Sequence, residues 1–432
     1  MNFYNLKHKE EQLNFKEATI KGQGKDKGLF FPEDISKFSN EFLQNLPNLS
    51  NEEIAFQVMK DFAGDEIPEA ELRKIVAETI AFEIPLKKVT ENISVLELFH
   101  GPTLAFKDVG ARFMSRCLGY FLKNETRKVT VLVATSGDTG GAVANGFYDV
   151  EGIEVVILYP KNRVSPVQEK QLTALGKNIH ALEVNGSFDD CQALVKQAFS
   201  DESLNEKLLL TSANSINVAR WLPQQIYYVL ALKQWLKNNS ENPVICVPSG
   251  NFGNICAGIL AHHRGLPVEH FIAACNVNDV VPEYLRTEIL QPKETVATIS
   301  NAMDVGDPSN FVRILELFDK EFNQVKNKLS GYTIDDEETL KTIKRVEKDY
   351  GYVLDPHGAV AFVALEKYLT ENDGKGFFLE TAHPVKFPDS VEQATGKSVE
   401  IPKSLEELMK QEKFTTEINP QYEELKEFLL KK

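Results

Sequence analysis

The chain has 432 residues, of which 42% are hydrophobic and 26% are charged, proportions typical of a globular protein with two or three domains. Its formal net charge of −15 disfavours non-specific binding to nucleic acid or anionic lipid. An anionic ligand would therefore need a local cluster of hydrogen-bond donors.

Residues 1–95 are predicted to form a separate, mainly helical region. Helical periodicity is clearest in "NEEIAFQVMKDFAG" (51–64) and "PEAELRKIVAETIAF" (68–82). We expect a smaller α/β domain over residues 96–225 and a larger one over 226–432, which would also contain helices at the C-terminus.

From residue 127 onward, short apolar runs alternate with helical segments. The runs "IEVVILYP" (153–160) and "NIHALEV" (178–184) lack the polar–apolar alternation of a half-exposed strand. Such strands, when helices join them, indicate parallel sheets that are buried on both faces. The predicted class is therefore α/β, with two parallel-rich sheet domains, flanking helices and the helical N-terminal region. The charged tail after residue 400 is predicted to form a pair of surface helices.

Two glycine-rich loops each follow a predicted strand and open a predicted helix. They are "ATSGDTGG" (134–141) and "PSGNFGN" (248–254). Open parallel sheets bind ligands at the carboxyl ends of their strands, where exposed backbone N–H groups and helix N-termini favour anions. We therefore predict two anion-binding loops. Neither loop matches the common NAD or ATP fingerprints, so these nucleotides are poorly supported.

A single lysine, Lys107, lies in "LELFHGPTLAFKDVGARFM" (96–114), between an aromatic-lined turn and an apolar-faced helix. A lysine becomes a useful nucleophile when burial or a neighbouring cation lowers its pKa. Its sequence neighbours alone favour a surface lysine paired with Asp108. Together with two anion-binding loops downstream, Lys107 instead fits an aldehyde cofactor that carries a phosphate.

The cysteines and the N-terminus predict a cytoplasmic protein. The five cysteines are scattered among apolar residues, without the spacing of a disulfide framework or a zinc site, so we expect reduced packing residues and no metal. The N-terminus does not resemble a signal or transit peptide. No uncharged apolar run approaches the roughly 18 residues that span a bilayer, so no membrane partner is expected.

These motifs resemble the threonine synthase family, which belongs to the fold type II pyridoxal phosphate enzymes. "HGPTLAFKD" (100–108) resembles the family's Schiff-base motif, with the lysine at Lys107. "TSGDTG" (135–140) is similar to the loop around the substrate carboxylate and the cofactor ring. "PSGNFGN" is similar to the loop that holds the cofactor phosphate.

Three further segments extend the resemblance over nearly the whole chain. "SANSINVARWLPQ" (212–224) resembles a segment more specific to threonine synthases than to the wider group. "ETAHPVKF" (380–387) is similar to the C-terminal motif whose threonine faces the pyridine nitrogen. "KEATIKGQGKDKGLFFPE" (16–33) resembles the family's opening, which usually carries two glycines where this chain has Lys27 and Gly28.

The resemblance implies the tryptophan synthase β-like fold and a lyase that converts O-phospho-L-homoserine and water to L-threonine and phosphate. This reaction is the last step of threonine biosynthesis. Lys107 would hold the cofactor and then act as a general base, while Asp138 would lie near the cofactor's phenolic oxygen. The implied cofactor-binding residues are Lys107, Phe106, Asp138, Ser249, Gly250, Asn251, Phe252, Gly253, Asn254 and Thr381.

The resemblance also implies which residues bind the substrate. Arg220 can bind the substrate phosphate through two parallel hydrogen bonds, and Arg163 and Lys161 are left as alternatives. The implied substrate-binding residues are Thr135, Ser136, Gly137 and Thr139 for the carboxylate, and Asn214, Ser215, Asn217 and Arg220 for the phosphate.

Rival functions remain at this point, together with the oligomeric state. Another fold type II lyase, such as a threonine or serine dehydratase, or a sulfhydrylase that makes cysteine, would also need the lysine and the two loops. A phospholyase-like relative could keep the cofactor fold as a binding module. The segment "SANSINVAR" (212–220) favours the synthase over the dehydratases and the sulfhydrylase, because these enzymes need no second phosphate pocket. The protein is expected to be a monomer or a homodimer.

Overall fold

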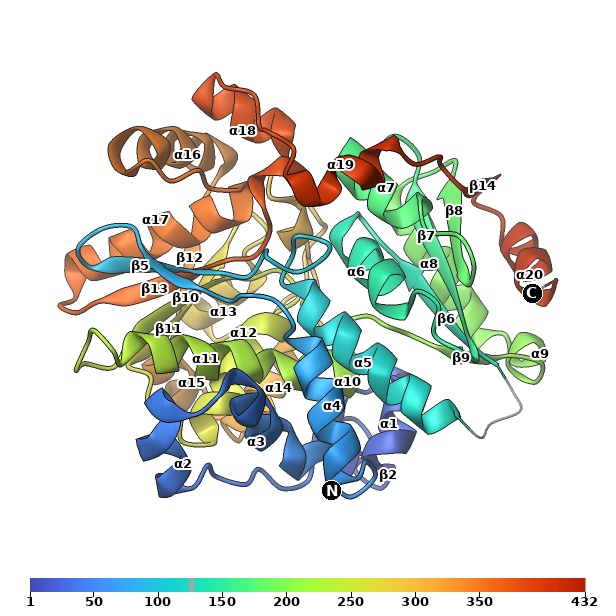
Figure 1. Cartoon of the computed structure of the whole chain (residues 1–432), viewed down its shortest axis with the longest axis horizontal. Helices are drawn as coiled ribbons and strands as arrows, with labels where there is room; N and C mark the ends of the chain where they lie inside the picture. Colours follow the sequence, from blue (N-terminus) through green and yellow to red (C-terminus); the bar gives the residue numbers. More distant parts are fainter. Residues whose placement is uncertain (124–127, 432) are drawn as a thin grey trace.

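Two parallel-rich sheets form the main body of the molecule (Figure 1). The computed structural model describes residues 1–123 and 128–431. The larger sheet has the strand order β12–β11–β10–β13–β5–β4, and only the β4–β5 pair is antiparallel among its described strands. Its strands are β4 (Leu86–Lys88), β5 (Ile93–Glu97), β10 (Val244–Pro248), β11 (His270–Cys275), β12 (Leu329–Thr333) and β13 (Gly376–Glu380).

The second sheet has the order β14–β8–β7–β6–β9, and its neighbouring strands are all parallel. Every residue of β6 and of β10 is buried, which explains why their sequences show no alternation. The predicted α/β class with two parallel-rich sheets is confirmed. The strands of this sheet are β6 (Val129–Ala134), β7 (Ile153–Pro160), β8 (Ile179–Val184), β9 (Leu209–Thr211) and β14 (Thr415–Ile418).

Helices cover both faces of the larger sheet (Figure 1). Those labelled α16 and α17 lie on one side, and α11 and α12 lie on the other. The helices of this half are α11 (Gln225–Trp235), α12 (Gly253–His263), α13 (Val280–Thr287), α14 (Phe311–Leu317), α15 (Phe322–Lys328), α16 (Asp336–Tyr350), α17 (Pro356–Glu371) and α18 (Pro388–Thr395).

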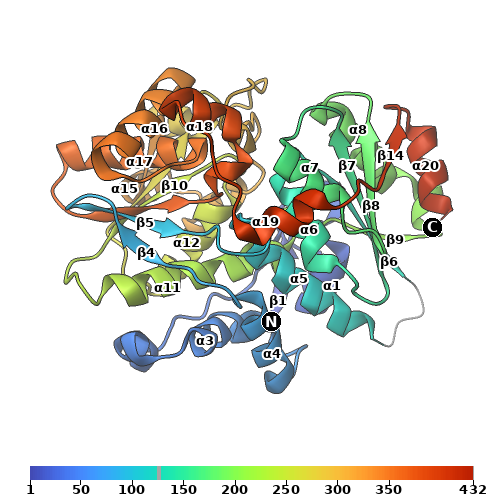
Figure 2. The same cartoon turned by 45° about the horizontal axis from the view of Figure 1, so that its top comes forward.

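The second sheet is also covered on both faces, with α6 and α7 on one side and α8 and α20 on the other (Figures 1 and 2). Helix α5 runs beside this sheet and packs against α6. The helices of this half are α5 (Lys107–Leu122), α6 (Asp138–Phe147), α7 (Pro166–Thr173), α8 (Phe188–Ser200), α9 (Glu202–Asn205), α10 (Val218–Trp221), α19 (Lys403–Lys410) and α20 (Tyr422–Leu430).

The N-terminal region is less helical than predicted. Besides its helices it contains a small antiparallel sheet of order β2–β1–β3, which the sequence analysis missed. These strands are three or four residues long, too short to show a clear period of two. The elements of this region are β1 (Asn2–Asn5), β2 (Gln12–Asn14), β3 (Phe30–Pro32), α1 (Phe15–Lys21), α2 (Asn40–Asn45), α3 (Asn51–Ala63) and α4 (Glu69–Thr79).

The expected domain boundaries cut across the two sheets in two places. The boundary expected after residue 95 falls within strand β5, which pairs with β13 in the larger sheet. Strand β14, which we assigned to the larger domain, pairs with β8 in the other sheet. Figure 2 shows the chain crossing from α18 through α19 to reach β14. The predicted C-terminal helix pair is present as α19 and α20, but a strand separates its members.

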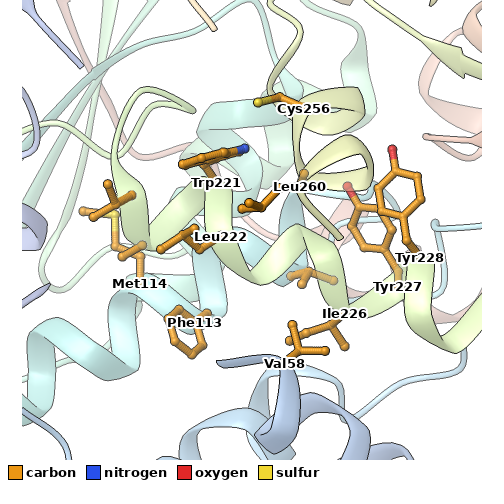
Figure 3. Close-up of a cluster of buried hydrophobic side chains, with 14 of the residues drawn as sticks. Val58, Phe113, Met114, Trp221, Leu222, Ile226, Tyr227, Tyr228, Cys256 and Leu260 are labelled. Atoms are coloured by element: carbon orange, nitrogen blue, oxygen red, sulfur yellow. The ribbon is translucent and has the colours of Figure 1, made fainter. Parts of the chain in front are cut away.

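One buried cluster joins the helices that carry the predicted site. Figure 3 shows side chains from α3, α5, α10, α11 and α12 meeting in it. Phe113 of α5 and Trp221 of α10 are fully buried, and each such side chain contributes about 1.5–3 kcal/mol through burial. The cluster therefore holds the N-terminus of α5, where Lys107 lies, in a fixed position relative to the N-terminus of α12.

The five cysteines are free and buried, as predicted for packing residues. Within residues 1–123 and 128–431, no helix has both the length and the apolar character needed to cross a membrane.

Candidate active site

A cavity of about 1660 Å³ opens at the carboxyl ends of strands from both sheets. Residues that follow β6, β10 and β13 line it, as expected for ligand sites in parallel sheets. The predicted site residues on its wall are Phe106, Lys107, Thr135, Ser136, Thr139, Asn214, Ser215, Arg220, Ser249, Gly250, Asn251, Phe252, Gly253, Asn254 and Thr381.

Lys107 is the first residue of α5, and the turn before it is fastened to the C-terminal motif. Ala105 and Ala382 form an isolated antiparallel bridge. The N–H of Phe106 donates to the carbonyl of Thr381 at 2.9 Å, and the N–H of His383 donates to the carbonyl of Leu104 at 3.0 Å. Residues far apart in the sequence therefore meet on one wall of the cavity.

Lys107 has the environment of a reactive amine. Its pKa is lowered to about 8, mainly by burial; Asp138 opposes this shift, and the nearby positive charges of Lys386 and Arg220 favour it. Asp108 does not pair with Lys107. Its carboxylate accepts hydrogen bonds from the N–H and the hydroxyl of Thr103, at 2.9 Å and 2.6 Å.

The aromatic surroundings of Lys107 are only partly as expected. The Phe106 ring lines the cavity, and the Lys107 amine lies 5.8 Å from its centroid. Phe99, the other aromatic residue of the turn before Lys107, packs against His100 and His383 and does not line the cavity. Of these two rings, Phe106 is therefore the one that can shield the Lys107 amine from water.

The loop at 248–254 has the features of a phosphate site. It joins β10 to the N-terminus of α12, where the first N–H groups of a helix have no partner within the helix. Asn254 accepts hydrogen bonds of 2.7 Å from Tyr227 and Tyr228 through Oδ1. Its Nδ2 is buried and has no partner among the described residues. An orphaned donor on the cavity wall fits an anionic group.

Gly250 allows this loop to lie close to a second segment. A Cβ atom at Gly250 would come within 2.6 Å of the Met303 Cα. The neighbouring Ala302 N–H donates to His357 Nε2 at 3.1 Å, and His357 Nδ1 lies 2.5 Å from the Asp355 carboxylate. Because Nε2 accepts, the proton of a neutral His357 is on Nδ1 and is donated to Asp355. His357 also lines the cavity and supports this segment.

The loop at 134–141 is held in shape from within. The Thr135 hydroxyl oxygen accepts from the N–H groups of Gly137 and Gly140, at 3.0 Å and 2.9 Å. Gly137 has a φ of 134°, which favours glycine, and a Cβ atom there would lie 2.5 Å from Gln168. Gly137 does not line the cavity, in contrast to its predicted contact with substrate.

Asp138 also does not line the cavity, and its carboxylate has partners that the sequence analysis missed. Lys386 Nζ lies 2.8 Å from Asp138 Oδ1, and Gln168 donates to the same oxygen at 3.0 Å. Although burial opposes it, attraction to Lys386 and Lys107 holds the pKa of Asp138 well below its usual range. Lys386 is part of "ETAHPVKF", so the sequence contained the signal, but only Thr381 of that motif was given a role.

Arg220 is the buried cation of the cavity. Its Nη1 donates to the carbonyl of Ala213, and its Nε has no partner among the described residues. Burial lowers its pKa to about 10, which leaves it charged at neutral pH. Asn214 and Ser215 line the same region, and Asn251 Nδ2 donates to the Ser215 hydroxyl at 2.8 Å. A buried guanidinium with a free donor fits an anion.

Asn217 requires a correction. Its Oδ1 accepts from the N–H of Ala219 as the N-cap of α10, and its Nδ2 donates to the carbonyls of Thr19 and Ser212. The side chain is fully buried and does not line the cavity. Asn217 supports the helix that presents Arg220, so it is not placed to bind substrate.

The two alternative cations differ in their positions. Arg163 is exposed and lines the cavity. Lys161 does not line it, and its Nζ lies 2.8 Å from a carboxylate oxygen of Glu417. Lys161 is therefore the weaker candidate for a phosphate ligand.

Comparisons with known proteins agree with this site. Residues 80–376 match the family model "Pyridoxal-phosphate dependent enzyme", and residues 2–80 and 358–429 match "Threonine synthase N terminus" and "Threonine synthase, C-terminal". The chain is 46% identical to threonine synthase from Haemophilus influenzae, with both chains fully covered, and 47% identical to that from Escherichia coli, with 94% of each covered.

Solved structures show the same relationship. The crystal structure of threonine synthase from Escherichia coli aligns with a TM-score of 0.93 at 44% identity, covering 100% of both chains. A structure of PLP-bound threonine synthase from Brucella melitensis aligns with a TM-score of 0.93 at 35% identity, covering 99% of this chain and 98% of the other. The cavity residues fit pyridoxal 5′-phosphate, the cofactor bound in the Brucella melitensis structure. The chain belongs to the threonine synthase family.

Proposed function

We propose that the chain converts O-phospho-L-homoserine and water to L-threonine and phosphate, with pyridoxal 5′-phosphate as its cofactor. The observation that carries the proposal is the meeting of three groups on one cavity: a lysine of lowered pKa, an anion-binding loop, and a buried arginine with a free donor. The cofactor and the substrate each carry a phosphate, and the loop and Arg220 are separate sites for the two.

Each cavity residue has a specific part in the proposal. The cofactor supplies electron withdrawal from the carbons next to the substrate amine. Lys107 binds the cofactor covalently and, once released, moves protons at Cα and Cβ. Residues 249–254 bind the cofactor phosphate, mainly through backbone N–H groups at the start of α12. The Thr381 hydroxyl is the partner of the ring nitrogen.

We assign the carboxylate and the phosphate of the substrate to different groups of cavity residues. Thr135, Ser136 and Thr139 bind its carboxylate, and the first turn of α6 adds favourable electrostatics. Arg220, with Asn214 and Ser215, binds its phosphate, and Arg163 contributes from the exposed rim. A site that binds the leaving phosphate favours its elimination from the substrate. A dehydratase does not need this step.

The test is the stoichiometry of the reaction. Purified protein with cofactor is incubated with O-phospho-L-homoserine, and phosphate and threonine are measured in the same samples. We expect one phosphate and one threonine for each substrate consumed. Release of a ketoacid from threonine, without threonine synthesis from O-phospho-L-homoserine, would instead identify a dehydratase.

The proposal also assigns the reaction to the cytoplasm and to a monomer or homodimer. Five buried, free cysteines support a reducing compartment. The substrate is a small molecule, and the net charge of −15 gives no support to a nucleic-acid partner. Size-exclusion chromatography with light scattering distinguishes a monomer from a homodimer.

A further inference from the structure

Lys386 is a fully buried lysine at the meeting point of three segments. It ends the short 3₁₀ turn Pro384–Lys386, which follows β13 of the larger sheet. Its Nζ lies 2.8 Å from Asp138 Oδ1, at the N-terminus of α6 in the other half, and donates to the carbonyl of Thr103 at 2.8 Å. Thr103 belongs to the turn that leads into Lys107.

Asp138 is thereby attached to the half of the molecule that carries the C-terminal motif. Gln168 of α7 donates to the same Oδ1 atom at 3.0 Å, and Asp138 Oδ2 has no hydrogen-bond partner within the described part of the chain. The carboxylate also lies in the first turn of α6, where the helix dipole favours a negative charge. Its charge and orientation are therefore fixed before any ligand binds.

Near Lys107, the Asp138 carboxylate faces more than one cation. Asp138 acts electrostatically on both Lys107 and Lys386, and Arg220 adds a further positive charge. Of these cations, only Lys386 forms an ion pair with the carboxylate; Lys107 has no ion pair among the described residues. A buried ammonium without a counter-ion is costly, and a lysine lowers that cost by losing its proton. The geometry thus assigns the carboxylate to Lys386 and leaves Lys107 without a counter-ion, which favours loss of its proton.

We propose that Lys386 is a positioning residue for the reaction: it is the counter-ion of Asp138, it holds Asp138 and Thr103 together across the two halves, and it thereby leaves the Lys107 amine free to react. This inference rests on the proposed role of Lys107. It gives Lys386 no contact with the reacting atoms, and it predicts an effect on the proton affinity of another residue.

The test measures the proton affinity of Lys107 in the full chain freed of cofactor. Competitive labelling with acetic anhydride over a pH series, followed by mass spectrometry of the Lys107 peptide, gives its apparent pKa. In Lys386→Met, Asp138 loses its partner and attracts the Lys107 ammonium, so this pKa is expected to rise. Labelling at pH 7 then falls by about tenfold for each unit of the rise.

A second variant separates this effect from a loosened structure. In Lys386→Met/Asp138→Asn the attracting carboxylate is removed too, so the apparent pKa of Lys107 is expected to return to the wild-type value or below it. If the site had merely opened to water, both variants would move the pKa to the ordinary value of 10.5, and the proposal would be overturned. An unchanged pKa in Lys386→Met would overturn it equally.

A control variant and an alternative test variant complete the design. Lys341→Met removes an exposed lysine that pairs with Glu337, and it should leave Lys107 labelling unchanged. If Lys386→Met does not fold, Asp138→Asn alone decides the question: the proposal requires that the pKa of Lys107 falls, and an unaltered value contradicts it.

The same samples distinguish this inference from the proposed function. After addition of pyridoxal phosphate and reduction with borohydride, mass spectrometry shows which lysine carries the cofactor. Attachment to a lysine other than Lys107 would contradict the proposed function, while the labelling experiment would still report whether Lys386 controls the pKa of Lys107.

Discussion

The backbone N–H of Phe106 donates a 2.9 Å hydrogen bond to the carbonyl of Thr381. Together with the bridge between Ala105 and Ala382, this bond fixes Lys107 and Thr381 on neighbouring positions of one cavity wall. Because main-chain groups make these contacts, a substitution of either side chain leaves the other in place. The two residues can therefore be tested separately.

Lys107→Ala is expected to abolish covalent attachment of the cofactor and to lower turnover by at least roughly 10²- to 10⁴-fold, the usual contribution of a general base. Visible absorption of the purified protein and mass spectrometry after borohydride reduction measure the attachment. Thr381→Ala is the matched comparison, since it should keep the covalent link and change only the rate. Retained attachment in Lys107→Ala would show that another lysine holds the cofactor.

Arg220→Met is expected to raise the KM for O-phospho-L-homoserine by roughly 10- to 150-fold, because a hydrogen bond to a charged group contributes about 1.5–3 kcal/mol. Inhibition by inorganic phosphate should weaken in parallel. Arg163→Ala, which removes the exposed cation of the same cavity, is expected to have a smaller effect. A larger effect from Arg163→Ala would move the main phosphate contact to the rim.

Local sequence signals predicted much of this structure. Ser165 and Ser187 cap α7 and α8, each in a capping box. Such a cap can be read from the sequence because both partners of the motif lie within four residues of each other. Short-range signals also predicted strands β6 and β10 and the loops that follow them. An apolar run marks each strand, and glycines mark each loop.

Features that depend on distant partners could not be predicted from the sequence. The ion pair of Asp138 and Lys386 joins residues 248 positions apart, and nothing in either segment specifies the other. Asn217 looked like a phosphate ligand because it lies between Asn214 and Arg220. Its donors in fact meet carbonyls at Thr19 and Ser212, the first of which comes from the N-terminal region.

Asn217 and Asn214 allow a direct comparison of a structural and a cavity asparagine. Asn217→Ala removes an N-cap and leaves two buried carbonyls without their donor, so we expect a loss of about 2–3 kcal/mol in the free energy of unfolding. Asn214→Ala, on the cavity wall, should instead raise KM with little change in stability. Urea denaturation and steady-state kinetics of both variants measure these effects. The reverse pattern would restore Asn217 as a substrate ligand.

Glu380, the residue before Thr381, is fully buried, and its surroundings favour the protonated form. Burial, together with repulsion from Asp355 and Glu97, raises its pKa well above the ordinary value of 4.5. Its Oε1 accepts from the N–H of Asp355 at 2.7 Å, and its Oε2 has no partner among the described residues. A glutamine has nearly the same shape as the protonated side chain, so Glu380→Gln should change the stability at pH 7 by less than about 1 kcal/mol.

The pH dependence of stability provides the sharper measurement. In the wild type, we expect the folded state to keep a proton on Glu380 that the unfolded chain releases near pH 4.5. The stabilising contribution is therefore fully present below that pH and is lost as the pH rises toward the raised folded pKa. In Glu380→Gln this loss disappears, so the free energy of unfolding from urea denaturation should fall less steeply with pH. Glu337→Gln, at an exposed carboxylate, should retain the wild-type slope, and equal slopes in all three proteins would mean that Glu380 is ionised in the folded state.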